Sequence, residues 1–176
     1  MDIFLQQIIN GLVLGSMYAL VALGYTMVYG IIGLINFAHG EVLMVGAMTS
    51  WSVISIMQDA MPGAPGWLLL ILALLISFVV CGILNFTIER VAYRPLRNAP
   101  RLAPLITAIG MSLFLQTMAM IIWKPNPKPF PAVLPTEPIA IGGAVISVTQ
   151  IFILGATAVT LAGLLYLVNR TKLGRA

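Results

Sequence analysis

The sequence predicts an all-α protein, a polytopic integral membrane helix bundle with about five transmembrane helices. The first observation is composition, because 60% of the 176 residues are hydrophobic and only 8% are charged. A soluble domain carries roughly 25% charged residues, so this chain cannot cover itself with a polar shell and must expose apolar surface to lipid. These proportions exclude a soluble enzyme, a secreted disulfide domain and a disordered chain.

The second observation is the length of the apolar runs. A bilayer core about 30 Å thick is crossed by roughly 20 apolar residues of helix. The charge-free stretch from Ile3 to Ala38 is too long for one span. We expect the chain to reverse near Gly30, Gly33 and Asn36, residue types that leave helical dihedral angles readily. The expected spans are residues 4–28, 40–58, 67–88, 102–123 and 149–168.

Prolines mark the expected connections between spans. Pro95 and Pro100 should prevent the third helix from continuing through residues 89–101. Six prolines in residues 124–138 predict an extended, polyproline-like loop outside the hydrocarbon. Residues 139–146 alternate weakly around a Gly-Gly pair, which predicts a small hairpin.

Basic side chains predict the orientation of the chain in the membrane. The net charge is +4, and most basic residues lie in residues 89–101 and 170–176, which flank apolar runs. Such clusters indicate cytoplasmic loops rather than a nucleic-acid partner. Alternation of the spans then places the N-terminus outside and the proline-rich loop outside.

The segment Asn36–Glu41 is the most unusual part of the sequence. A carboxylate at mid-membrane costs about 2.5–3.5 kcal/mol on insertion scales, so Glu41 should face protein, water or the interface. Three interpretations stay open: a helix start capped by Asn36, a gate on a substrate path, or a proton relay through His39 and Glu41. In the fourth span, Thr107 and Gly110 share one helix face and Ser112 and Gln116 share one. The candidate path or gate residues are Asn36, His39, Gly40, Glu41, Thr107, Gly110, Ser112 and Gln116.

Two further groups of residues are candidates for contacts. Small residues recur every four positions in the first span at Gly11, Gly15 and Ala19, which predicts close helix packing. The second group is polar and flanks the third and fifth spans, where it could anchor the chain or bind a cytoplasmic partner through arginine forks. Its members are Glu89, Arg90, Arg94, Arg97, Lys172 and Arg175.

Motifs for independent chemistry are missing from the sequence. No lysine follows a glycine as the phosphate-binding loop requires, and no Ser-His-acid or zinc-protease arrangement occurs. One histidine, one cysteine and no clustered carboxylates argue against a metal site. We therefore expect no catalytic residues, no metal and no cofactor, and a transport, channel or assembly role rather than an enzymatic one.

Several segments resemble a known family, the LivH-type permeases of branched-chain amino acid ABC importers. The resemblance lies in GSMYAL (15–20), GYTMVYGIIG (24–33), INFAHGE (35–41), ERVAYRPLR (89–97), IGMSLFLQ (109–116) and LGRA (173–176). It implies an all-α permease in the bacterial inner membrane that pairs with a second permease subunit, two cytoplasmic ATPases that bind ATP, and an external substrate-binding protein. Urea and amide importers use similar permeases, so the resemblance is less specific about the substrate.

The resemblance also leads us to expect a fragment. Family members are nearly twice as long, and the loop that docks onto the ATPase begins where this chain stops. We therefore expect residues 1–176 to be the N-terminal part of a single permease domain. Two other functions remain open: a secondary transporter or channel for a small polar solute that uses His39 and Glu41, and a non-transporting assembly subunit with a dimer face at Gly11 and Gly15.

Overall fold

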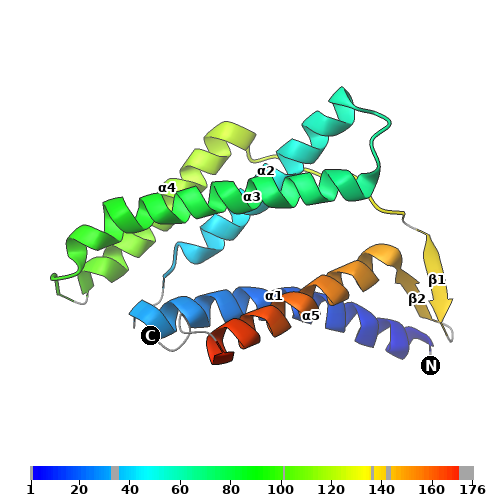
Figure 1. The fold of residues 1–176 in the computed structure, drawn as a ribbon, viewed down its shortest axis with the longest axis horizontal. Helices are drawn as coiled ribbons and strands as arrows, with labels where there is room; N and C mark the ends of the chain where they lie inside the picture. The colour runs from blue at the N-terminus through cyan, green and yellow to red at the C-terminus, as the bar shows by residue number, and fades with distance from the viewer. Residues whose placement is uncertain (1, 33–35, 101, 136, 142–143, 171–176) are drawn as a thin grey trace. The chain divides into compact units, whose positions relative to one another are not determined.

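The computed structural model describes residues 2–32, 36–100, 102–135, 137–141 and 144–170. Within these residues lie five long helices, each apolar enough to cross a membrane by length and composition. They are α1 (Asp2–Ile32), α2 (His39–Ala60), α3 (Gly66–Ile88), α4 (Leu102–Trp123) and α5 (Val148–Arg170) (Figure 1). The predicted all-α membrane fold with five spans is therefore confirmed.

The helices and the connecting segments divide into two compact units. One unit comprises Met1–Leu23 and Leu134–Ala176, and the other comprises Gly24–Val133. The first contains most of α1 together with α5, and the second contains α2, α3 and α4. The expectation of a single domain across residues 1–176 stays a prediction.

A short hairpin joins the proline-rich segment to α5. Strands β1 (Pro138–Ile141) and β2 (Ala144–Ser147) pair antiparallel, with Ile139 opposite Ile146, as the alternation around the Gly-Gly pair predicts. The Gln6 side chain of α1 holds this hairpin at both backbone groups of one residue. Its Nε2 donates to the Val145 carbonyl at 3.1 Å, and its Oε1 accepts from the Val145 N–H at 2.8 Å.

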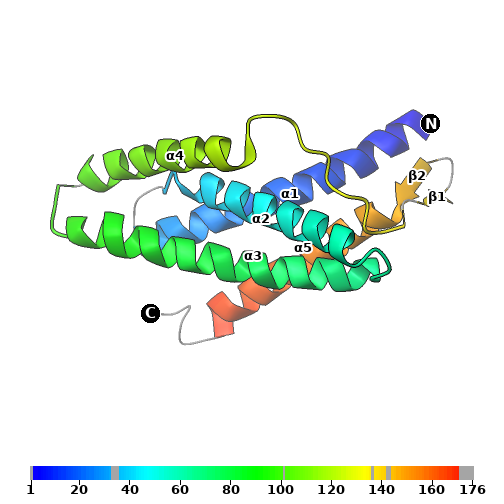
Figure 2. The same ribbon diagram turned by 90° about the horizontal axis from the view of Figure 1, so that it is seen from above.

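In the second unit, α2 packs against both α3 and α4 (Figure 2). The core is the cluster of Val42, Ile88 and Leu115, which comes from all three helices. Small side chains let α2 and α3 approach closely, since a Cβ built on Gly46 would lie 2.9 Å from Cys81 Sγ. One turn further along α2, the hydroxyls of Ser50 and Ser77 lie 2.7 Å apart in a hydrogen bond.

The end of the third span differs from the prediction. Helical structure continues past Ile88 as a π-helical turn (Glu89–Tyr93) and a 3₁₀ turn (Arg94–Leu96), where residues 89–101 were expected to be a loop from the start. Pro95 does not interrupt these turns because it lies in the first residues of the 3₁₀ turn, where a missing N–H breaks no helical hydrogen bond.

The end of α4 is also defined by its backbone. Lys124 has a φ of 61°, and its N–H donates to the Met120 carbonyl at 3.0 Å. This left-handed residue closes the last turn of α4, a place that glycine or asparagine usually occupies. Pro125 follows and cannot continue the helix, so the chain leaves α4 as the extended segment that the prolines predict.

Candidate functional site

The turn before α2 is organised by Asn36. Its Oδ1 accepts hydrogen bonds from the Ala38 N–H at 3.0 Å and from the Tyr93 hydroxyl at 2.7 Å, and its carbonyl accepts from the His39 N–H at 3.1 Å. The prediction that Asn36 caps α2 is wrong in its position, because Ala38 is the N-cap residue and Asn36 forms a turn two residues earlier. Asn36 instead links the start of α2 to the π-helical turn that contains Tyr93.

His39 and Gly40 contact the end of α1 that belongs to the same unit. The Gly40 N–H donates to the Tyr25 hydroxyl at 3.2 Å, and the Tyr25 ring meets the His39 imidazole edge-on with centroids 4.9 Å apart. A Cβ built on Gly24 would overlap this imidazole, lying 2.7 Å from its Cε1 atom. A glycine is therefore required at position 24 for this approach. Gly24 and Tyr25 belong to a segment that resembles the LivH-type permeases, but their place beside His39 was not predicted.

Glu41 is held by two side chains from α4. Its Oε1 accepts from Gln116 Nε2 at 2.7 Å and from Ser112 Oγ at 3.0 Å. Hydrogen bonds to a carboxylate are stronger than those between neutral groups. The predicted shared face of Ser112 and Gln116 therefore exists and is directed at the predicted carboxylate.

Two other candidate path residues are not brought to this cluster. Thr107 is half-buried and lies outside the Glu41 contacts, and Gly110 is exposed. A Cβ built on Gly110 would meet nothing within 4 Å among the described residues. Among the described residues no ion pair joins His39 to Glu41, whereas Arg97 pairs with Glu89. The proton relay through His39 and Glu41 stays a prediction.

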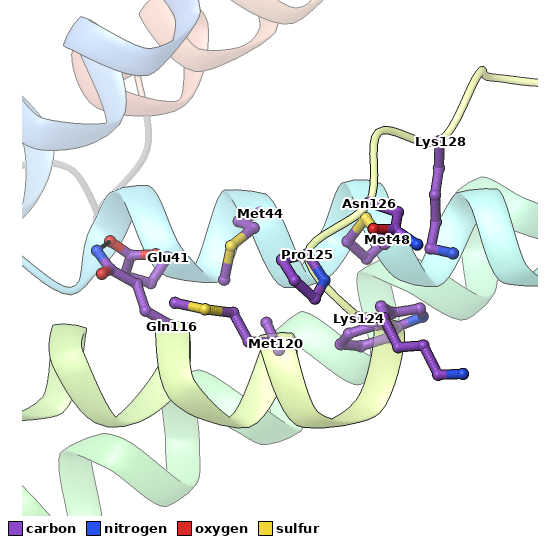
Figure 3. Close-up of a pocket in the computed structure, with 11 residues that line it drawn as sticks. Glu41, Met44, Met48, Gln116, Met120, Lys124, Pro125, Asn126 and Lys128 are labelled. Atoms are coloured by element: carbon purple, nitrogen blue, oxygen red, sulfur yellow. Dashed lines mark hydrogen bonds between the residues drawn. The ribbon is translucent and has the colours of Figure 1, made fainter.

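Glu41 and Gln116 lie at one end of a cavity with a volume of about 410 Å³ (Figure 3). The middle of its wall is formed by Met44 from α2 and Met120 from α4. The other end is formed by Met48, by Trp123 and by the segment that follows α4. That segment contributes four residues: Lys124, Pro125, Asn126 and Lys128.

The end of α4 and the segment after it are attached to α2 by two tryptophans. Trp51 Nε1 donates to the Pro129 carbonyl at 3.0 Å, and Lys128 Nζ lies over the Trp51 ring, 4.8 Å from its centroid. Trp123 Nε1 donates to Ser52 Oγ at 2.8 Å. These contacts fix the lysine-bearing end of the cavity. Neither the methionine wall nor this attachment was predicted, although Met44 and Met48 are spaced as one helix face.

The candidate partner contacts lie on exposed surface. Arg97 Nη2 and Glu89 Oε1 form an ion pair at 2.7 Å, with side chains 72% and 42% exposed. Such a surface pair contributes little to stability, about 0–1 kcal/mol. Arg90 and Arg94 are also exposed. Lys172 and Arg175 lie outside the described residues.

The predicted packing face of α1 has no partner among the described residues. Ala19 is exposed, and a Cβ built on Gly11 or Gly15 would meet nothing within 4 Å. Its role in close helix packing stays a prediction. In the described residues there is also no group of three or more His, Cys, Asp or Glu side chains that could hold a metal ion.

Known proteins resemble this chain over nearly all of its length. Residues 7–176 match the family described as "Branched-chain amino acid transport system / permease component". The high-affinity branched-chain amino acid transport system permease protein BraD of Pseudomonas aeruginosa is 45% identical over 181 residues, which cover 98% of this chain and 57% of BraD. The corresponding LivH protein of Escherichia coli is 56% identical over 113 residues, which cover 64% of this chain and 36% of LivH.

The chain thus spans little more than half the length of BraD and about a third of LivH. No solved structure matches it. The predicted resemblance is confirmed by the family match, which also agrees with a multi-pass membrane protein. The chain belongs to the family of permease components of branched-chain amino acid transport systems.

Proposed function

We propose that this chain forms part of the permease subunit of an ABC importer, which carries branched-chain amino acids across the bacterial inner membrane. The observation that supports this most strongly is the 45% identity to BraD over 98% of the chain. This subunit would translocate the substrate and would not itself catalyse a reaction. ATP would be bound and hydrolysed by partner ATPases, in keeping with a sequence that has no phosphate-binding loop.

The proposed partners follow from the same likeness. They are a second permease subunit, two cytoplasmic ATPases and an extracytoplasmic substrate-binding protein. In the proposed orientation the N-terminus is outside, and residues 89–101 and 170–176 are cytoplasmic. The exposed Arg90, Arg94 and Arg97 would then face the ATPases, and the cavity end with Lys124 and Lys128 would face the outside.

Uptake of radiolabelled leucine by cells that carry the complete transport system tests the function. We expect uptake to stop when the ATP-binding lysine of the partner ATPase is replaced by alanine, and to persist when a protonophore is added and ATP is maintained. Uptake that survives loss of the ATPase and stops with the protonophore would contradict the proposal and favour a secondary transporter. Competition by unlabelled valine, isoleucine, urea and acetamide identifies the substrate class.

Reporter fusions test the orientation separately. A fusion of alkaline phosphatase after residue 130 should be active, because that enzyme needs the oxidising outer compartment to form its disulfides. A fusion after residue 98 should be inactive. The reverse pattern would overturn the orientation and leave the transport proposal intact.

A further inference from the structure

The cavity between α2, α4 and the segment after α4 carries opposite charges at its two ends. Glu41 lies at one end and Lys128 at the other, with methionine side chains between them (Figure 3). Glu41 and Met48 both line it and are seven residues apart on α2, so its length along the helix is about 10 Å at 1.5 Å per residue. Its volume of about 410 Å³ falls in the range of small-molecule sites, roughly 300–1,000 Å³.

The Glu41 carboxylate at one end is held in place through only one of its two oxygens. Both donors from α4, Ser112 and Gln116, bind the same oxygen, Oε1. Glu41 Oε2 has no hydrogen bond to another described residue. A carboxylate oxygen that is held in place and left without a donor is suited to an ammonium group, which brings three donors and a positive charge.

The wall between the charged ends is suited to an aliphatic side chain. Met44, Met48 and Met120 line it. Methionine is unbranched, apolar and flexible, so a methionine wall can adapt to side chains that branch at different carbons. Met44 is three residues from Glu41 on α2, so this apolar surface begins within one helical turn of the carboxylate.

We propose that this cavity holds the substrate during passage, with its ammonium on Glu41 Oε2 and its branched side chain against Met44 and Met120. The proposal rests on the proposed function and names the site that serves it. An α-amino acid carries both charges on one carbon, so one molecule cannot contact both ends of a cavity about 10 Å long. Lys124 and Lys128 therefore act first, attracting the carboxylate, and Glu41 binds the ammonium after the molecule has moved inward.

Thiol protection tests the placement of the side chain. The complete permease, with its partner subunits in proteoliposomes, would carry Cys81→Ala together with Met44→Cys or Met120→Cys. We expect saturating leucine, delivered by the binding protein, to slow alkylation at both positions several-fold. Met118→Cys is the matched control. Met118 is on the same helix as Met120 and is 39% exposed, but it does not line the cavity. Its alkylation rate should not change.

Transport by Glu41→Gln tests the ammonium contact. The amide keeps an oxygen for Ser112 and Gln116 but places an N–H donor where the ammonium would bind. We expect the KM of the complete system for leucine to rise, or its maximal rate to fall, by roughly 10- to 100-fold, the loss of a hydrogen bond to a charged group. Asp59→Asn is the control, because Asp59 is an exposed acid on the same helix outside this cavity.

The outcomes separate this inference from the proposed function. Normal leucine transport by Glu41→Gln, or alkylation at positions 44 and 120 that leucine does not slow in an active transporter, overturns the inference and leaves the function intact. If Glu41→Gln fails to assemble, the protection experiment decides. If the wild-type complex takes up no branched-chain amino acid, both the function and the inference fall.

Discussion

The hydrogen bonds from α4 to Glu41 predict that the effect of Gln116→Leu on stability depends on the residue at position 41. Replacing Gln116 by leucine removes a 2.7 Å donor from the carboxylate. An interhelical hydrogen bond in membrane proteins averages about 0.6 kcal/mol with a maximum near 1.7, and hydrogen bonds to charged groups contribute about 1.5–3 kcal/mol in soluble ones. We therefore expect Gln116→Leu to lower the free energy of unfolding by about 1–2 kcal/mol.

Adding Ser112→Ala should cost more than the sum of the two single changes. Ser112 supplies the other donor to Oε1, at 3.0 Å, so the double variant leaves the carboxylate with no donor from α4. In a Glu41→Leu background the sign reverses, because the Gln116 amide has already lost its acceptor. There Gln116→Leu should be neutral or stabilising, because the amide has no partner on Glu41 to lose and leucine removes an unpaired polar group from an apolar contact.

The assay is reversible unfolding of the full-length permease by dodecyl sulfate in mixed micelles, followed by circular dichroism. Thr117→Ala serves as the control on the same helix, because the Thr117 hydroxyl donates to the Leu113 carbonyl of its own helix at 2.9 Å. Its effect should stay within about 0.5 kcal/mol. An equal cost for Gln116→Leu with Glu41 and with Leu at position 41 would refute the reasoning, because the cost would then not come from the carboxylate.

Two other substitutions follow from local geometry. Gly24→Ala should destabilise the permease by about 1–3 kcal/mol in the same unfolding assay, since its Cβ would overlap the His39 imidazole. Gly82→Ala is the control: a Cβ there would meet nothing within 4 Å, so this change should be neutral or stabilising by up to about 1 kcal/mol. Equal effects at the two glycines would count against the close approach of His39. Gln6→Glu keeps the acceptor for the Val145 N–H but loses the donor to its carbonyl. Amide exchange in residues 139–141 and 144–147 should therefore accelerate roughly fivefold, for a loss of about 1 kcal/mol. Unchanged exchange would show that the Gln6 contact does not hold the hairpin.

The helices were predictable because the length of an apolar run is written directly in the sequence. Predicted and observed spans differ mainly at their ends, where α1 runs to Ile32 and α2 begins at His39. The structure beyond Ile88 was not predictable from proline alone. A proline forbids helix only where its missing N–H or its ring disturbs the preceding turn, and at the start of a new turn it disturbs neither.

The site was predictable in part. A lone carboxylate between apolar runs marks Glu41, and the spacing of Ser112 and Gln116 gives their common face. The same spacing separates them from the other candidate pair. At 3.6 residues per turn, Thr107 and Gln116 are about 180° apart on α4, and Gly110 and Ser112 are about 160° apart. Helical geometry alone therefore places the two pairs on different sides of α4. In the structure Ser112 and Gln116 bind Glu41, whereas Gly110 is exposed.

The spacing of small residues along one helix does not identify the helix that packs against them. The predicted small residues Gly11 and Gly15 have open space around them among the described residues, whereas Gly46 meets Cys81 closely. Gly46 with Ser50, and Ser77 with Cys81, have the same four-residue spacing as the α1 glycines. A spacing of small residues permits close approach, but which helix approaches depends on contacts between distant segments. The sequence of one helix does not contain that information.

The first turn of α2 joins three parts of the second unit. Tyr25 binds the Gly40 N–H, Tyr93 binds Asn36 just before the helix, and α4 binds Glu41. The π-helical turn that contains Tyr93 carries the exposed Arg90, and Arg94 and Arg97 follow it. The surface around residues 89–97 and the Glu41 end of the cavity are therefore connected through residues 36–41. Linkage makes any coupling along this route reciprocal. If a partner bound at residues 89–97 changes the affinity of the cavity for its ligand by some factor, the ligand must change the affinity of the partner by the same factor.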